Sequence, residues 1–191
     1  MVKKSNKRPH QLRVIAGQWR GRKLTVCDAI GLRPTSDRIR ETVFNWLTPK
    51  ITGAKCVDLF AGTGALGIEA ASRGAAAVDL VEVNKSAVMQ LNAHLTTLDA
   101  KQCHCHHTTA QQWIVQCRQQ YDIVFIDPPF QAALWAEVVS GLHQYQLLAQ
   151  GAWIYIEQPN TAAITLPDKW QQYKQKKAGA VSYGLYQYHG E

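Results

Sequence analysis

The sequence predicts an α/β fold, in which a mainly parallel β-sheet is covered by helices on both faces. Three observations support this class. Short β-rich runs alternate with segments of helical spacing between residues 56 and 156. A glycine-rich turn connects the first of these runs to a helix, as in nucleotide-binding folds. The last two β-rich runs, 170–176 and 181–188, have no helix between them, so the sheet should end with antiparallel strands.

Positive charge is concentrated at the start of the chain. Residues 1–40 hold eleven of the 21 Lys and Arg residues but only two of the 14 acids, which gives this segment +9 and the remainder −2. We expect residues 1–10 to form a flexible basic tail. A tail of this kind is usually just solvated, so its charge alone does not indicate a function.

Residues 11–30 predict a basic β-hairpin. Residues 12–16 and 22–26 have the composition of strands and flank a turn at 17–21. The turn presents Trp19, which we expect to be exposed, among cations. Aromatic rings beside cations are typical of nucleic-acid binding. The nucleic-acid contacts predicted on this hairpin are Arg20, Arg22 and Lys23.

A helix should follow the hairpin, with a cap at Thr35 or Ser36. The apolar positions on one of its faces are Ile39, Val43, Trp46 and Leu47. The positions on the opposite face are Arg38, Glu41 and Asn45. That second face is either a solvated surface with an Arg38–Glu41 ion pair or a phosphate-binding surface beside the hairpin. The phosphate-binding interpretation predicts contacts to nucleic-acid phosphates at Arg33, Arg38 and Arg40.

A strand, a glycine loop and a helix follow at residues 56–60, 61–67 and 68–71. The loop has the spacing G-x-G-x-x-G, which lets the backbone approach a ligand at the start of a helix. Glu82 closes the next strand, where a carboxylate can accept hydrogen bonds from both hydroxyls of a ribose. An acid at this position suits NAD and S-adenosylmethionine equally.

Asp58, just before the glycine loop, distinguishes these two cofactors. A carboxylate there would repel a pyrophosphate but would attract the ammonium group of a methionine moiety. The alternative is an acid that caps a helix or a turn. Together with the motif at residues 127–130, Asp58 favours S-adenosylmethionine over a nicotinamide cofactor.

The middle of the chain continues to alternate between helices and strands. The predicted elements are a helix around Leu91 and Leu95, a polar strand at 102–108, a helix at 111–119, a strand at 121–126, a helix around Val138 and a strand at 153–156. Such alternation places ligands at the carboxyl ends of the parallel strands.

The strand at 121–126 runs directly into Asp127-Pro128-Pro129-Phe130. The Asp127 carboxylate and the Pro128 carbonyl can accept hydrogen bonds from both N–H groups of an exocyclic amine, favouring the pyramidal nitrogen needed for attack. The prolines hold that carbonyl outward, and Phe130 can stack on a flat base. The motif therefore indicates methylation of an amine, and its alternative is an ordinary proline-rich turn.

Composition excludes several classes of protein. The five cysteines lack a C-x-x-C pair, which favours reduced thiols and a cytoplasmic location. There is neither a membrane-spanning stretch nor a signal peptide pattern, so we expect no membrane partner. Residues 103–107, Cys-His-Cys-His-His, alternate between the two faces of a strand, so we predict a polar edge strand and no metal. The sequence contains no nucleophile-elbow motif, so we do not expect Ser-His-Asp catalysis.

Five segments occur in the order found in a known family. They are residues 13–17, 20–24, 32–42, 58–67 and 127–130. Over nearly its whole length the chain resembles the RsmD family, bacterial methyltransferases that modify a guanine N2 of 16S ribosomal RNA. The resemblance implies a class I methyltransferase domain over residues 31–191, with a seven-stranded sheet whose last strand is antiparallel. It also implies S-adenosylmethionine as cofactor and, as partner, 16S rRNA in an assembled or partly assembled small ribosomal subunit. We expect a monomer.

The resemblance also implies the residues of the site. The expected cofactor contacts are Asp58, Phe60, Ala61, Gly62, Thr63, Gly64, Glu82, Asn84, Thr109 and Ala110. The implied amine-binding residues are Asp127, Pro128, Pro129 and Phe130. Two positions depart from commoner relatives, because Asn84 stands where an acid is frequent and Thr109 replaces the Asp or Asn that holds the adenine amine. The backbone N–H of Ala110 is then the expected contact to the adenine ring.

We expect direct methyl transfer to a base that is unpaired or rotated out of its helix, with Asp127 stabilising the charge on the attacking amine. The runner-up function is adenine-N6 methylation of DNA or RNA, because its motif has the same chemistry. A nicotinamide-dependent oxidoreductase would explain the glycine loop but not the Asp127 motif. A cofactor-free RNA-binding module would explain the basic residues within 1–40, called the basic front below, but not the glycine loop.

Overall fold

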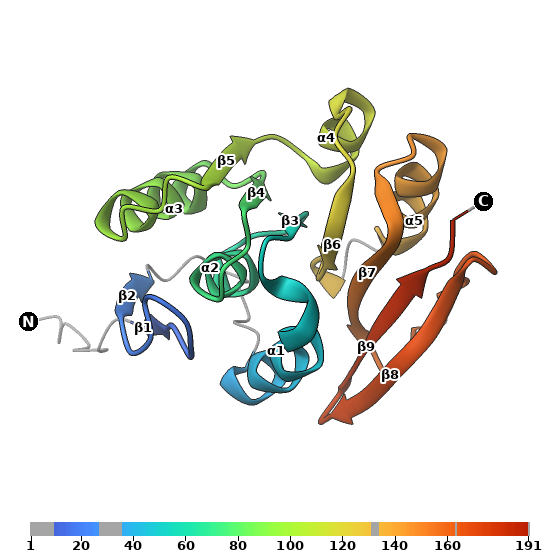
Figure 1. Ribbon diagram of the computed structural model, residues 1–191, viewed down its shortest axis with the longest axis horizontal. Helices are drawn as coiled ribbons and strands as arrows, with labels where there is room; N and C mark the ends of the chain where they lie inside the picture. The colour runs from blue at the N-terminus through green and yellow to red at the C-terminus, as the bar shows by residue number, and fades with distance from the viewer. Residues whose placement is uncertain (1–9, 27–35, 131–133, 163, 191) are drawn as a thin grey trace, which may run out of the picture.

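The computed structural model describes residues 10–26, 36–130, 134–162 and 164–190 (Figure 1). A central seven-stranded sheet has the strand order β5-β4-β3-β6-β7-β9-β8. In chain order its strands are β3 (Lys55–Asp58), β4 (Ala77–Glu82), β5 (Cys103–His107), β6 (Tyr121–Ile126), β7 (Leu148–Pro159), β8 (Trp170–Ala178) and β9 (Val181–Tyr188). Strands β3 to β7 are parallel, whereas β9 is antiparallel to both β7 and β8. The predicted fold class, including the antiparallel end, is confirmed.

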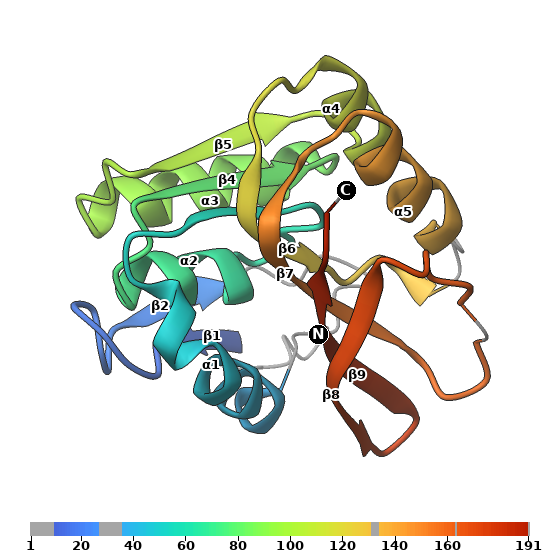
Figure 2. The same ribbon diagram turned by 45° about the vertical axis from the view of Figure 1, so that its right-hand side comes forward.

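Helices cover both faces of the sheet (Figures 1 and 2). They are α1 (Asp37–Ile51), α2 (Ala65–Ser72), α3 (Lys85–Thr97), α4 (Ala110–Gln116) and α5 (Trp135–Gln144). Helices α1, α2 and α3 pack into one hydrophobic cluster, and α4 and α5 pack into the other. The strands feed both clusters by alternation: in β6, Ile123 and Phe125 enter the first, whereas Val124 and Ile126 enter the second.

A two-stranded antiparallel hairpin, β1 (His10–Arg13) and β2 (Lys23–Val26), precedes the sheet. The predicted hairpin is therefore confirmed, with shorter strands than expected. Leu12, Val14 and Leu24 are buried in the same cluster as α1, α2 and α3. The hairpin thus shares its core with the rest of the molecule, which fixes its position over α2 and α3.

Helix α1 begins as the sequence predicts. The Ser36 hydroxyl caps it by accepting a hydrogen bond of 3.3 Å from the Ile39 N–H. Ile39, Val43 and Leu47 are buried, and Trp46 packs against the core from a half-buried position. Thr35, the other predicted cap, lies outside the described residues.

Candidate active site and nucleic-acid interface

The predicted acids converge on one edge of the sheet. Strand β3 lies between β4 and β6, with Asp58 in register with Leu80 and Phe125. Glu82 lies two residues beyond Leu80, and Asp127 two residues beyond Phe125. All three acids therefore stand at the carboxyl ends of adjacent parallel strands, where α/β folds bind their ligands.

Asp58 is wrapped by the loop that follows it. It is only 2% exposed, and its carboxylate accepts hydrogen bonds from the N–H groups of Phe60 (3.4 Å) and Gly67 (3.1 Å). Burial raises its pKa from the usual 3.8 to about 7, with nearby Glu82 adding to the rise and the two hydrogen bonds opposing it. A cation that binds beside a buried acid with this pKa stabilises its ionised form strongly, because little water is present to do so.

The glycine loop itself is stabilised by Glu82. The Glu82 carboxylate is buried and accepts hydrogen bonds from the N–H of Gly62 (2.8 Å) and the N–H of Asn84 (2.7 Å). Gly64 has a φ of +83°, and a Cβ there would lie 2.6 Å from Ile68 Cδ1. Glycine is therefore required at this position both by the backbone conformation and by the close packing of the loop. The other predicted loop contacts, Phe60, Ala61 and Thr63, lie within the same turn.

Asn84 and Thr109 each cap a helix. The Asn84 side-chain oxygen accepts hydrogen bonds from Ser86 and Ala87 at the start of α3. The Thr109 hydroxyl accepts one of 3.2 Å from the Gln112 N–H at the start of α4. Ala110 is the first residue of α4, where backbone N–H groups have no partner within the helix. The caps explain why Asn and Thr occupy these positions.

The Asp127 motif lies at the boundary of the second hydrophobic cluster. Asp127 is half-buried, Pro128 is buried and Pro129 is exposed. The ring of Phe130 packs against the cluster with its centroid 6.1 Å from that of Trp135, and it stays partly exposed. The side chain of this aromatic residue is therefore positioned by packing while one part of it remains accessible.

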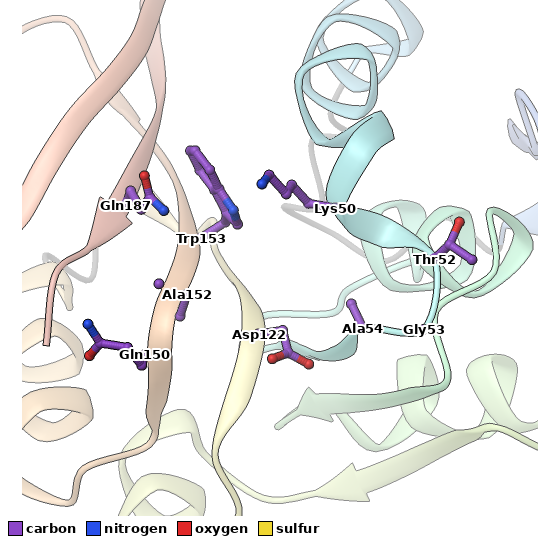
Figure 3. Close-up of a pocket in the computed structure, with 10 residues that line it drawn as sticks. Lys50, Thr52, Gly53, Ala54, Asp122, Gln150, Ala152, Trp153 and Gln187 are labelled. Atoms are coloured by element: carbon purple, nitrogen blue, oxygen red, sulfur yellow. The ribbon is translucent and has the colours of Figure 1, made fainter.

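A prominent cavity lies away from this edge. Its volume is about 420 Å³, and it lies beside Lys50, Asp122 and Trp153, at the ends of β3 and β6 where those strands begin (Figure 3). The converging acids lie where the same strands finish. The cavity is therefore at the opposite edge of the sheet from the candidate active site.

The basic hairpin is attached to α2 by hydrogen bonds. The Glu69 carboxylate accepts hydrogen bonds from the N–H groups of Ile15 (2.8 Å) and Ala16 (3.0 Å). The Ser72 hydroxyl donates to the Ala16 carbonyl at 2.6 Å. At Gly17, with φ +83°, a Cβ would lie 1.8 Å from the Ser72 carbonyl oxygen, so only glycine allows this approach.

Four of the predicted RNA contacts have exposed side chains. They are Arg20, Arg22, Lys23 and Arg38. Arg22 also donates a hydrogen bond to the Thr97 carbonyl. Arg33 lies outside the described residues. The Arg38–Glu41 face of α1 is exposed as predicted, although the ion pair that forms at this spacing is Asp37–Arg40.

Arg40 corrects one prediction. It was expected to contact RNA, but its side chain is 1% exposed and points into the protein. Its guanidinium donates hydrogen bonds to Asp37, to the Arg13 carbonyl and to the Ala65 carbonyl, with Glu69 at 3.9 Å. A buried arginine held by these acceptors has a structural role, because it cannot reach a phosphate outside.

Trp19 also differs from expectation. It was predicted to be exposed on the hairpin turn, yet it is half-buried and packs against the first hydrophobic cluster. The docking of the turn on Ser72 explains this, since the Trp19 N–H donates to the Ser72 hydroxyl at 3.1 Å. This aromatic residue stabilises the hairpin position.

The histidine and cysteine segment is strand β5 at the edge of the sheet, as predicted. His106 lies 2.6 Å from the Asp79 carboxylate, which also accepts a hydrogen bond from the Tyr121 hydroxyl. Within the part of the chain that the structure describes, His, Cys, Asp and Glu side chains form no group of three that could hold a metal. No helix among those residues is long and apolar enough to span a membrane.

Glu69 was not predicted as a functional residue from the sequence. A single acid in the otherwise apolar and small helix Ala65–Ser72 was the available signal, because an acid among buried positions requires partners. The lysines of β8 were not predicted either, and their signal was a run of 22 residues, 169–190, without an acid.

Comparison with known proteins gives concordant results. The family model described as conserved hypothetical protein 95 matches residues 12–187. Ribosomal RNA small subunit methyltransferase D of Escherichia coli is 45% identical over 188 residues, which cover 98% of this chain and 95% of that protein. The protein of the same name from Haemophilus influenzae is 42% identical, covering 93% and 94%. A solved Escherichia coli structure assigned as a methyltransferase has 43% identity and a TM-score of 0.90, covering 95% of this chain and 100% of that one.

Proposed function

The chain belongs to the family of conserved hypothetical protein 95, and from this membership we infer that it is an S-adenosylmethionine-dependent methyltransferase of small-subunit ribosomal RNA. The same inference follows from its full-length similarity to enzymes of that name. We propose further that its target is the exocyclic N2 amine of one guanine. The structural observation that carries the methyltransferase proposal is the convergence of Asp58, Glu82 and Asp127 at one sheet edge.

The acids at that edge suit the cofactor chemically. S-adenosylmethionine, when bound, supplies an electrophilic methyl group on a sulfonium. We propose that Glu82 accepts hydrogen bonds from the ribose hydroxyls while it continues to hold Gly62. Because Asp58 is buried beneath the loop, it acts on the ammonium group through its electric field. The Ala110 N–H at the start of α4 is the proposed adenine contact, since the Thr109 hydroxyl already caps that helix.

Asp127 to Phe130 would hold the base that receives the methyl group. In this proposal the Asp127 carboxylate and the Pro128 carbonyl accept hydrogen bonds from the amine, and the accessible part of Phe130 stacks on the base. Transfer is then one displacement, and Asp127 stabilises the positive charge that develops on nitrogen. The amine proton afterwards passes to water.

The RNA would reach this edge across the basic front. Arg20, Arg22, Lys23 and Arg38 are exposed on the hairpin and on the first turn of α1. Because the hairpin shares its core with the domain, its cations are held at a fixed place relative to the catalytic edge. We propose three functional parts: a basic tail at 1–10, a hairpin that grips RNA at 11–30 and a methyltransferase domain at 31–191. We also propose that the protein acts as a monomer in the cytoplasm, on an assembled or partly assembled subunit.

Two measurements test the proposal. Calorimetric titration with S-adenosylmethionine and with NAD separates a methyltransferase from an oxidoreductase and from a cofactor-free RNA-binding module. Incubation of the protein with undermethylated small-subunit rRNA, both naked and in subunits, followed by mass mapping of the methylated base, identifies the target. Methylation of adenine N6 in place of guanine N2 would contradict the specificity but not the chemistry.

A further inference from the structure

Strand β8 forms an exposed and strongly basic edge of the sheet. It is the last strand in the sheet order, and every residue from Gln171 to Lys177 is exposed. Residues 169–190 contain four lysines and no acid. The net charge of the chain outside residues 1–40 does not reveal these lysines, because acids elsewhere in that part outnumber the basic residues. Figures 1 and 2 show β8 at the outer side of the sheet, away from the hairpin.

The lysines on one side of this strand lie over aromatic rings. Lys174 lies 4.8 Å from the ring centroid of Tyr173, and Lys176 lies 5.9 Å from that of Trp46 in α1. At the mouth of the cavity in Figure 3, Lys50 points toward Trp153 and lies 5.8 Å from its ring centroid. These six residues, Trp46, Lys50, Trp153, Tyr173, Lys174 and Lys176, are called the lysine–aromatic face below.

The aromatic rings of this face also contact one another and the sheet. Trp153 and Tyr173 meet edge to face at 5.1 Å, and Trp46 stacks on Tyr183 of β9 at 5.8 Å. Tyr173 is nevertheless 52% exposed. An exposed ring with packed neighbours is a platform on which an unpaired base can stack with little loss of side-chain freedom.

The lysines of this face carry charge that no ion pair among the described residues neutralises. Among the residues that the structure describes, no salt bridge within 4.0 Å involves Lys50, Lys174 or Lys176. Lysines often protect an edge strand against pairing with another sheet. Pairing β8 with a second copy would bring like charges together, so the face suits a polyanion better than a second copy.

The register of the sheet relates this face to the catalytic edge. Ile126 is level with Ile156, Ile156 with Gly184, and Gly184 with Gln175. Lys176 is therefore level with Asp127, three strand spacings or about 14 Å across the sheet. Trp46 is eight residues after Arg38 along α1, a rise of about 12 Å. The Lys176 end of the face therefore lies nearest the catalytic edge, whereas Lys50 and Trp153 lie toward the opposite edge of the sheet.

We propose that the lysine–aromatic face is a second RNA-binding surface, which binds phosphates of the rRNA that flanks the target nucleotide while Tyr173 stacks on an unpaired base. This proposal rests on the proposed function and adds a surface on the side of α1 opposite the hairpin. The lysines suit a polyanionic backbone, and the exposed aromatic ring suits accessible bases.

The test compares two double variants of equal charge. Lys174→Gln with Lys176→Gln changes the face, and Lys55→Gln with Lys101→Gln changes exposed lysines elsewhere. Affinity for a small-subunit rRNA fragment is measured over a range of salt concentrations. We expect the face variant to bind roughly tenfold more weakly or worse, with the slope of log K against log salt reduced by about 1.4–1.8. The control variant should keep the wild-type slope, and both should bind S-adenosylmethionine normally.

Tyr173→Ala tests the stacking role separately, because it removes no charge. It should weaken binding of rRNA by about fivefold or more without changing the salt slope. Equal slopes and affinities for the wild type, the face variant and the control would overturn the proposal, and so would a wild-type dimer that the face variant dissociates. Those results leave the proposed function intact as long as the wild type methylates rRNA. Failure of the wild type to methylate rRNA would instead overturn the proposed function.

Discussion

The Glu82 carboxylate holds the Gly62 N–H at 2.8 Å, which couples the end of β4 to the glycine loop. One acid thus sets the shape of the loop and faces the proposed ribose position. We expect Glu82→Ala to weaken S-adenosylmethionine binding by about 1–3 kcal/mol, because two hydroxyls lose a charged acceptor and the loop loses a support. Calorimetric titration measures the dissociation constant for S-adenosylmethionine. Glu41→Ala, at an exposed acid on α1, is the matched control, and an unchanged dissociation constant in Glu82→Ala would remove Glu82 from the cofactor site.

Asp127→Ala should separate binding from chemistry. We expect cofactor affinity close to wild type and single-turnover methylation slower by on the order of a hundredfold or more, since a contact to charge in the transition state is lost. Asp168→Ala, at an exposed acid far along the chain, serves as the control. Full single-turnover activity in Asp127→Ala would show that the amine is held by other groups.

Cofactor binding should depend on pH through Asp58. Its pKa in the free protein is about 7, and an ammonium group bound beside it favours the ionised form. Between pH 7 and pH 5, therefore, the affinity for S-adenosylmethionine should fall by up to about tenfold per pH unit, because binding must first release a proton. Calorimetry in buffers of different ionisation enthalpy would detect that proton. In Asp58→Asn the affinity should be lower and nearly independent of pH over this range.

The Asp58 carboxyl should also make the stability of the fold depend on pH. Its folded pKa of about 7 lies above its usual 3.8, so its contribution to stability is fully present below about pH 4 and is lost as pH rises through 7. The difference in unfolding free energy between the wild type and Asp58→Asn should therefore shift against the wild type from pH 4 to pH 7. Urea denaturation at several pH values measures it, and a constant difference would contradict the raised pKa.

If the basic front binds rRNA phosphates, the affinity for rRNA should depend on salt concentration. Replacing Arg20, Arg22, Lys23 or Arg38 singly by alanine should reduce the slope of log K for rRNA against log salt by about 0.7–0.9, with cofactor binding unchanged. Deleting residues 1–8 should matter less, because a tail loses part of its attraction in ordering entropy. If the deletion lowers rRNA affinity more than Arg38→Ala or Arg33→Ala does, recognition lies in the tail.

Glu69→Ala should release the hairpin. The substitution removes the acceptor of the Ile15 and Ala16 N–H groups and leaves the buried Arg40 without a nearby acid on α2. We expect a loss of about 3–5 kcal/mol in unfolding free energy and faster hydrogen exchange at both amides. Glu69→Gln retains an oxygen acceptor and should lose less. Slow exchange in Glu69→Ala would mean that the hairpin is held by its apolar contacts alone.

The sequence by itself determined the features that arise from neighbouring residues. Alternation of strands and helices, the Ser36 cap and the glycine loop depend on spacing within a few residues, and the structure confirms each of them. The order of Asp58, Glu82 and Asp127 at strand ends also followed from local pattern, because parallel strands bring their carboxyl ends to one edge. The chemistry proposed for those residues remains a prediction.

Only the tertiary structure decided which polar residues face solvent. Arg40 and Arg38 are two residues apart in one helix, yet Arg40 is buried among Asp37, Glu69 and backbone carbonyls, whereas Arg38 is exposed. Glu69 reaches Ile15 across 54 residues, and Lys176 of β8 reaches Trp46 of α1. No local pattern encodes these pairings. A charged side chain is buried only where distant segments bring enough acceptors to replace its water, and that supply depends on the packed fold.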